Sequence, residues 1–178
     1  AFEFFSQSAL DKVTAQMGHA VPFATQTPFY ALLEFESAAE AELDKAMALF
    51  EQTVEQGWVL DGVLSQSLSQ AEALWKLRED ISETLWHWQP YKNDISVLVS
   101  RMTDFLCEVD ELVDKSYPDF ELVWYGHIGD GNLHLNILKP KALSNKDFVA
   151  RCVPVSKEIG QLLAKYEGSV SAEHGVGL

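Results

Sequence analysis

The chain has 178 residues, of which 47% are hydrophobic and 22% are charged, so its composition is that of one ordinary globular domain. The 13 Lys and Arg residues against 27 Asp and Glu residues leave a formal net charge of -14. A field of that sign repels phosphate backbones, so no nucleic acid partner is expected. An anionic substrate would need a local pocket of positive charge.

Membrane-spanning and disulfide-rich classes of protein are not supported by the sequence either. No run of eighteen apolar residues occurs, so we expect no transmembrane segment. Cys107 and Cys152 form no framework of disulfides and fit a reducing, cytoplasmic compartment, although one bridge between them stays open. The first residues lack the basic and apolar regions of a signal peptide, and both ends of the sequence are typical of cuts within a longer chain.

Hydrophobic spacing divides the first half of the chain into alternating helices and strands. A stripe of apolar residues predicts a helix over Phe2–Met17, and an apolar, aromatic run predicts a buried strand over Phe29–Phe35. Ser37 then has the position of a helix cap, and apolar residues recur on one helical face until Gly57. The apolar run Trp58–Leu64 predicts a second strand.

The second half continues this alternation and adds one tight pair of strands. The order from the strand at position 29 onward is β-α-β-α followed by β-α-β-β-α. It predicts an α+β fold of two ferredoxin-like halves, in which helices cover one face of a mostly antiparallel sheet, within a single domain over residues 1–178. The expected elements are a helix over Ser69–Leu85, a strand over Ile95–Val99, a helix from Ser100 to just before Pro118, strands over Glu121–Tyr125 and Leu133–Leu138, and a helix from Ser144 to Gly168.

The segment with the most chemistry, residues 124–136, contains an Asp-Gly step between two predicted strands. Asp-Gly favours a two-residue type I′ turn, and a turn centred on Asp130 and Gly131 places His127 directly opposite His134. Directly opposed β-carbons lie about 4.5–5.5 Å apart, so the two imidazoles could share one cation. The alternative is two histidines that bond to backbone or water, but the nearby glycines favour a site that needs close approach.

A second segment, Glu173-His174 before a glycine, offers further groups for such a site. Glu173 could serve as a third ligand, and His174 could stay unbound as a base. Two histidines and one carboxylate suit Zn²⁺, Mn²⁺ or Fe²⁺. Asn136 follows His134 by two residues and therefore points to the same face of its strand. For the Glu-His-Gly run alone, the alternative is a surface turn with incidental polar residues.

A third segment supplies positive charge. Arg78 and Ser82 lie one turn apart on one helical face, and Lys92 follows before a predicted strand. An Arg side chain binds a carboxylate through two parallel hydrogen bonds, which suits an anionic substrate. On spacing alone, a solvated polar helix face explains these residues more simply.

Together, the three segments resemble one known family. Two motifs, Tyr125-Gly-His-Ile-Gly-Asp-Gly-Asn-Leu-His-Leu-Asn136 and Ser171-Ala-Glu-His-Gly-Val-Gly177, resemble the C-terminal substrate (cap) domain of FAD-linked oxidases of the vanillyl-alcohol-oxidase type. Trp75-x-x-Arg78-Glu-x-Ile-Ser82 and Lys92-x-Asp94-Ile-Ser96 are similar to the D-2-hydroxyglutarate and D-lactate dehydrogenase branch in particular. The resemblance covers nearly the whole chain.

The resemblance implies a role for each candidate residue. His127, His134 and Glu173 match metal ligands, with zinc or manganese as the ion, and His174 matches the catalytic base. Ser82 stands where relatives often have Thr. The residues that match substrate-binding groups are Arg78, Ser82, Lys92 and Asn136.

The resemblance also implies an enzyme larger than this chain. The family binds FAD mainly through a separate N-terminal domain, which residues 1–178 do not include, so we expect the isolated chain to be inactive. The implied reaction is FAD-dependent oxidation of a D-2-hydroxy acid, of the 2-hydroxyglutarate or lactate type, to the 2-oxo acid. An electron-transfer flavoprotein or a quinone is the implied electron acceptor.

Two other functions fit the same residues. A stand-alone, metal-binding ferredoxin-like domain would have a regulatory role, and a metallohydrolase would use His174 to activate a metal-bound water. An FAD-binding domain upstream on the same chain would favour the dehydrogenase, whereas ester or amide cleavage by this domain alone would favour the hydrolase. A diacid substrate is favoured over lactate or glycolate if Arg78 and Lys92 both reach the pocket.

Overall fold

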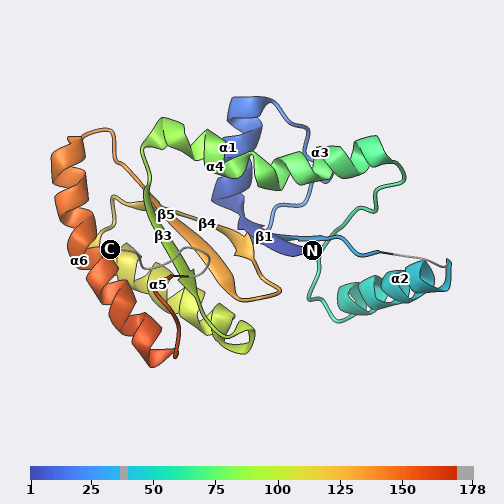
Figure 1. Cartoon of the computed structure of the whole chain (residues 1–178). Helices are drawn as coiled ribbons and strands as arrows, with labels where there is room; N and C mark the ends of the chain where they lie inside the picture. The colour runs from blue at the N-terminus through green and yellow to red at the C-terminus, as the bar shows by residue number, and fades with distance from the viewer. Residues whose placement is uncertain (37–39, 172–178) are drawn as a thin grey trace.

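The computed structural model describes residues 1–36 and 40–171, which form an antiparallel sheet between two layers of helices (Figure 1). The sheet has five strands in the order β2-β1-β4-β5-β3, and all neighbouring strands pair antiparallel. The predicted α+β class with a mostly antiparallel sheet is confirmed. The strands are β1 (Phe2–Ser6), β2 (Phe29–Leu33), β3 (Tyr91–Ser96), β4 (Glu121–His127) and β5 (Asn132–Leu138).

Helices cover both faces of the sheet, whereas the sequence predicted cover on one face. Alternate residues of a strand point to opposite faces, so each face can build its own core. The structure has two separate clusters of buried apolar side chains, and one cluster lies under each helix layer. One face packs against α1 (Gln7–Met17), α3 (Leu68–Glu79) and α4 (Ile81–Leu85), and the other packs against α5 (Met102–Ser116) and α6 (Asn145–Lys165).

The layer of α5 and α6 covers the larger of the two cores. Leu135 of β5, Phe105 of α5 and Ile159 of α6 are at most 1% exposed within it. Both helices have the amphipathic spacing that the sequence predicts. Ser144 caps α6 as expected, because its hydroxyl accepts a hydrogen bond from the N–H of Asp147 at 3.2 Å.

The beginning of the chain differs from its prediction. The predicted helix over Phe2–Met17 is wrong for its first residues, which form β1. Phe4 and Phe5 of this strand enter opposite cores, and the Ser6 hydroxyl then accepts a hydrogen bond from the N–H of Ala9 at 3.4 Å, where α1 begins. The aromatic spacing suits either a helix or a strand, and pairing with both β2 and β4 decides for the strand.

Two other predicted elements are corrected. The predicted strand Trp58–Leu64 has no regular structure, and its Trp58 is 77% exposed, because no strand in the described residues lies beside it to pair. The single predicted helix Ser69–Leu85 is divided at Asp80 into α3 and α4. This division lies between two candidate site residues and changes how they face the sheet.

Helix α2 (Glu40–Glu55) lies to one side of the sandwich (Figure 1). The predicted Ser37 cap of this helix lies outside the described residues. Two short 3-10 turns are η1 (Trp86–Trp88) and η2 (Val99–Arg101), and Ser100 lies within η2, so it does not cap α5 as predicted. No helix in the described part of the chain is long and apolar enough to cross a membrane.

Candidate functional site

The site residues that lie on strands share one face of the sheet, the face that packs against α1, α3 and α4. Strand register pairs Glu3 of β1 with His127 of β4, and it pairs Tyr125 of β4 with His134 of β5. His134 pairs on its other side with Asp94 of β3. Because paired residues of neighbouring strands point to the same face, these side chains converge on one region of it.

The predicted two-residue turn at the Asp-Gly step is wrong, although the expected approach of the two histidines holds. His127 pairs with Asn132 rather than with His134, and the loop between the strands spans residues 128–131. A type I′ turn needs a positive φ at both central residues, and in this loop only Gly131 has one, at 80°. The two imidazoles are therefore diagonal neighbours, with ring centroids 5.4 Å apart at an interplanar angle of 83°.

Hydrogen bonds from distant strands hold this longer loop. The N–H of Gly129 donates to the Phe2 carbonyl at 3.2 Å, and the N–H of Val97 donates to the Gly131 carbonyl at 3.1 Å. A β-carbon on Gly131 would lie 2.0 Å from the Val97 carbonyl oxygen, so glycine is required there. The local sequence of a turn does not indicate such distant hydrogen-bond partners, and the prediction of a two-residue turn from the Asp-Gly step was therefore wrong.

The carboxylates of Glu3 and Asp94, which no sequence motif singled out as site residues, orient the two histidines. The Oε1 atom of Glu3 lies 2.8 Å from Nδ1 of His127, and Oδ1 of Asp94 contacts Nδ1 of His134. Glu3 lies directly across from His127 on β1, and Asp94 lies directly across from His134 on β3, so the two strands flank the β4-β5 pair. A carboxylate at Nδ1 fixes the proton there and leaves the acceptor lone pair on Nε2, the arrangement of metal-binding histidines.

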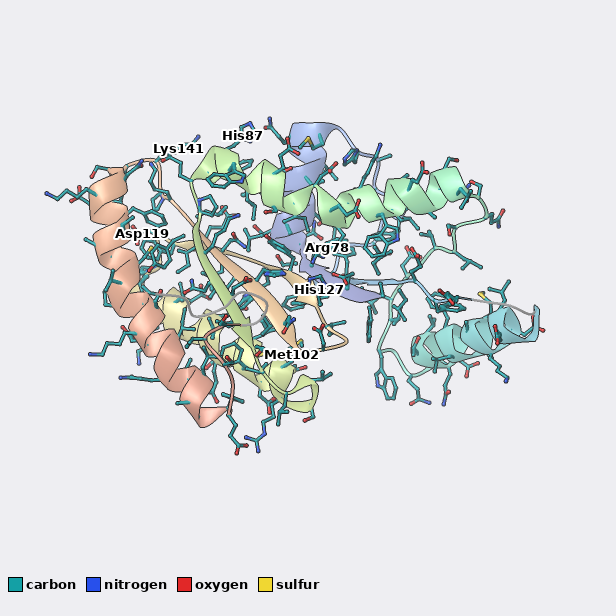
Figure 2. The ribbon with its side chains drawn as sticks, viewed as in Figure 1. Arg78, His87, Met102, Asp119, His127 and Lys141 are labelled. Atoms are coloured by element: carbon teal, nitrogen blue, oxygen red, sulfur yellow. The ribbon has the colours of Figure 1, made fainter. Side chains whose placement is uncertain are left out.

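Arg78 reaches the same region from the C-terminal end of α3. Its Nη2 lies 2.9 Å from Oε2 of Glu3, and its guanidinium carbon lies 4.8 Å from the centre of the Tyr125 ring. Arg78 and His127 lie together between α3 and the sheet (Figure 2). Arg78 is only 8% exposed, so the solvated helix face weighed for it is wrong. Its Nε has no hydrogen-bond partner among the described residues, which leaves a buried donor for a ligand.

The remaining predicted substrate groups form a neighbouring cluster. Strand β3 begins at Tyr91, earlier than predicted, and this pairs Lys92 with Asn136 of β5. The Lys92 ammonium lies 3.4 Å from the Ser82 hydroxyl, so the structure brings these two candidate residues together. Asn136 is 1% exposed, and its Oδ1 lacks a hydrogen-bond partner among the described residues. A buried acceptor of that kind is suited to a substrate hydroxyl.

Glu173 and His174, predicted as third ligand and base, lie outside the described residues. The last described residues of the chain pair with strand β3. Ser169 pairs with Ser96 of β3, with N–O distances of 3.0 and 2.8 Å in the two directions. Ser96 lies two residues from Asp94 on the same face of the sheet, so Ser169 lies beside the edge strand that contains Asp94.

A complete metal site is not present among the described residues alone. Over residues 1–36 and 40–171, no group of three or more His, Cys, Asp or Glu side chains is arranged to hold a metal ion. The two imidazoles with carboxylates at Nδ1 are therefore a partial donor set. They fit a divalent cation chemically and require at least one further ligand.

Comparison with known proteins assigns a family. All of residues 1–178 match the family model described as the C-terminal domain of FAD linked oxidases. A D-2-hydroxyglutarate dehydrogenase from Stutzerimonas stutzeri is 59% identical over 178 residues, and one from Xanthomonas citri pv. viticola is 54% identical over 178 residues. A mitochondrial D-2-hydroxyglutarate dehydrogenase from Danio rerio is 33% identical over 180 residues. These alignments include the whole chain but only 38%, 38% and 32% of the respective relatives.

Proposed function

The chain belongs to the family of C-terminal domains of FAD-linked oxidases, and from this premise we propose that it binds substrate and a metal ion within a longer FAD-dependent dehydrogenase. The proposed enzyme oxidises a D-2-hydroxy acid to the 2-oxo acid. The observation that carries this proposal is the convergence of two carboxylate-oriented imidazoles, a buried guanidinium and a buried amide oxygen on one sheet face. Such a face offers both a cation site and binding groups for an anionic alcohol.

The substrate class follows from the two cationic side chains. Arg78 is on α3 and Lys92 is on β3, and if both reach the pocket, each can bind one carboxylate of a diacid. A 2-hydroxyglutarate-type substrate has a second carboxylate, and lactate does not. The names of the two relatives at 59% and 54% identity support the same choice. Lactate is the second candidate, since a 36% identical relative from Schizosaccharomyces pombe is named a putative D-lactate dehydrogenase.

The donor set fits a divalent cation held by His127, His134 and Glu173. Zinc and manganese both accept two imidazoles and one carboxylate. The carboxylates at Nδ1 of both histidines are the outer partners that such ligands use. When bound, the ion supplies Lewis acidity that lowers the pKa of a substrate hydroxyl.

The residues of this chain then have separate tasks in the oxidation. Arg78 and Lys92 bind and orient the substrate carboxylates, and Asn136 contacts the substrate beside them. His174 accepts the hydroxyl proton as a general base, while the hydrogen on the same carbon leaves with its electron pair. FAD, bound mainly by the rest of the longer chain, supplies the acceptor for that hydride.

Partners outside this chain are part of the same proposal. The FAD-binding domain would belong to the same protein outside this chain, because the chain spans only 38% of each of the two relatives at 59% and 54% identity. The family resemblance implies that this domain is N-terminal. The reduced flavin would pass its electrons to an electron-transfer flavoprotein or a quinone. The cytoplasmic location expected from the two cysteines stays a prediction.

The substrate is tested with the full-length enzyme, a panel of D-2-hydroxy acids and a dye as electron acceptor. We expect the highest kcat/KM with D-2-hydroxyglutarate, loss of turnover after treatment with a chelator, and recovery with Zn²⁺ or Mn²⁺. Preference for lactate would favour the second candidate. Turnover that is indifferent to the chelator would contradict the metal site, and ester or amide cleavage without flavin would instead indicate a metallohydrolase.

The base is tested by His174→Ala in the same enzyme. We expect turnover to fall by about 10²–10⁴-fold while the metal content stays unchanged, because the base is not a ligand. His87→Ala is the matched control, since His87 contacts Gln16 and the carbonyl of Thr84 away from the histidine pair. Equal activity of the two variants would refute the role of His174.

A further inference from the structure

A buried carboxylate, that of Glu3, lies between two groups with different proposed tasks. Its Oε1 lies 2.8 Å from Nδ1 of His127, and its Oε2 lies 2.9 Å from Nη2 of Arg78. The Glu3 side chain is 8% exposed and that of Arg78 is 10% exposed. One carboxylate therefore contacts an imidazole of the cation site with one oxygen and the substrate-binding guanidinium with the other.

We propose that Glu3 is a positioning residue that couples cation retention at His127 to substrate binding by Arg78. The inference rests on the functions proposed above for those two side chains. A buried carboxylate is costly unless its charge is balanced, and Oε2 of Glu3, which has no hydrogen-bond partner among the described residues, depends on its ion pair with Arg78. Conversely, each partner depends on Glu3 for its orientation.

The position of Glu3 in the sheet makes it a rigid link. Its strand, β1, pairs with β2 on one side and β4 on the other, so its backbone is fixed from both edges. The guanidinium of Arg78 also packs over the ring of Tyr125, which lies two residues before His127 on β4. The imidazole and the guanidinium therefore share one carboxylate whose backbone is fixed within the sheet.

Glu3 also leaves part of the guanidinium for a ligand. The ion pair uses Nη2, whereas Nε has no hydrogen-bond partner among the described residues. The contact is an ion pair rather than a directed hydrogen bond, because Oε2 of Glu3 has no hydrogen-bond partner among the described residues. The guanidinium is planar, so its ion pair with Glu3 and its stacking on Tyr125 together restrict its orientation. Glu3 would thus aim Arg78 at a substrate carboxylate as well as balance its charge.

Asp94 provides a matched comparison. Its carboxylate contacts Nδ1 of His134 in the same way, but it belongs to β3, on the other side of the histidine pair from Glu3 and β1. If both carboxylates only orient histidines, their removal should have the same consequences. If Glu3 also sets Arg78, removal of Glu3 alone should weaken substrate binding once the cation site is saturated.

The test uses Glu3→Gln and Asp94→Asn in the full-length enzyme. Bound metal is measured after dialysis against graded chelator, and KM for D-2-hydroxyglutarate is measured at saturating Zn²⁺ or Mn²⁺. We expect both variants to lose metal at roughly 10-fold lower chelator, because outer partners of metal ligands contribute about 10–100-fold to affinity. Only Glu3→Gln should also raise KM, by about 10-fold, as expected for a weakened charge-assisted contact.

An unchanged KM for Glu3→Gln at saturating metal, or unchanged metal retention, would overturn the coupling. Arg78→Lys and the double variant with Glu3→Gln complete a cycle, in which the effects on KM should be less than additive. If Arg78→Lys and His127→Gln have no effect by themselves, the proposed function fails instead. Should Glu3→Gln not fold, Glu3→Asp keeps the buried charge and is expected to give the same joint loss, because its shorter side chain cannot reach both partners.

Discussion

The two faces of the sheet use alternate residues of the same strands, yet they bury different chemistry. On β5, Leu133, Leu135 and Ile137 enter the apolar core under α5 and α6, whereas His134 and Asn136 between them belong to the candidate site. The apolar face holds the strands in register, and this register is what sets the positions of the polar groups. A rigid apolar core on one face of the sheet therefore allows polar, functional groups to be positioned on the other face.

The site face contains groups that do not favour folding. The ion pair between Glu3 and Arg78 removes two charges from water, and its attraction is offset by that desolvation. Oδ1 of Asn136 has no hydrogen-bond partner in residues 1–36 and 40–171, and a buried polar atom left unpaired costs about 1–3 kcal/mol. Replacing a buried, unpaired polar group of the site by an apolar one should therefore stabilise the fold, whereas truncating an apolar side chain of the core under α5 and α6 should destabilise it.

The largest effect is expected on the α5 and α6 face, from Leu135→Ala. Leu135 is 0% exposed, so its truncation removes apolar contacts and leaves a cavity, and the free energy of unfolding should fall by about 2–5 kcal/mol. Urea unfolding measures this loss. Leu135→Met keeps the volume and should cost less than about 1.5 kcal/mol. Equal costs for the two variants would mean that this face does not hold the sheet.

A smaller loss is expected from Gly131→Ala in the loop that aligns the histidines. The φ of 80° strains any residue with a β-carbon, and that carbon would lie 2.0 Å from the Val97 carbonyl oxygen. We expect a loss of roughly 1–3 kcal/mol in urea unfolding. Gly160→Ala in α6 is the control, because its β-carbon would meet nothing within 4 Å and alanine favours a helix. A change of the same sign at both positions would contradict this account.

The sequence predicted the fold best where a single pattern decided the structure. Helix α6 has a long apolar stripe and a Ser144 cap, and strand β5 alternates between apolar and polar residues, so both were predicted correctly. The run Phe2–Ser6 was predicted as a helix because its aromatic spacing also suits a helix, and only pairing with two distant strands distinguishes the alternatives. Trp58–Leu64 has the residue types of a strand but no partner strand among the described residues.

The candidate site was predictable to the extent that it depends on strand alternation. His134 and Asn136 share a face by their spacing alone, and His127 joins them despite the wrong turn, because a register shift of two residues keeps the face. Glu3 was missed because it meets His127 across 124 residues of sequence. No local pattern predicts a contact of that range, so the partners that orient the histidines became visible only in the fold.

A gain of stability is expected from Asn136→Val on the site face. The change removes a buried acceptor that has no partner among the described residues, so unfolding should cost about 1 kcal/mol more. In the full-length enzyme the same change should raise KM for the hydroxy acid. Val123→Asn is the reverse control and should lower stability. Val123 of β4 is fully buried and lies directly across from Asn136 of β5. A loss of stability in Asn136→Val would mean that the amide has a structural role.

The smallest effect concerns Asp110, a half-buried carboxyl on α5 beside the apolar core. Burial raises the pKa of Asp110, and the charge of Asp114 adds to this, while the hydrogen bond from Nε1 of Trp124 lowers it. A carboxyl whose pKa is higher in the folded state than in the unfolded state destabilises the fold when it ionises. Asp110→Asn keeps an acceptor for Trp124 and should remove that penalty.

The gain from Asp110→Asn should therefore depend on pH. It should be near zero at about pH 3, where the carboxyl is protonated in both states, and should grow as the pH rises through the raised pKa. Above that pKa it should stay constant at no more than about 1 kcal/mol, because solvent screens a half-exposed group. Urea midpoints across this range measure the gain. A gain that is largest in acid would show that the apolar face does not penalise this charge, and the contrast between the two faces would then be weaker than their packing indicates.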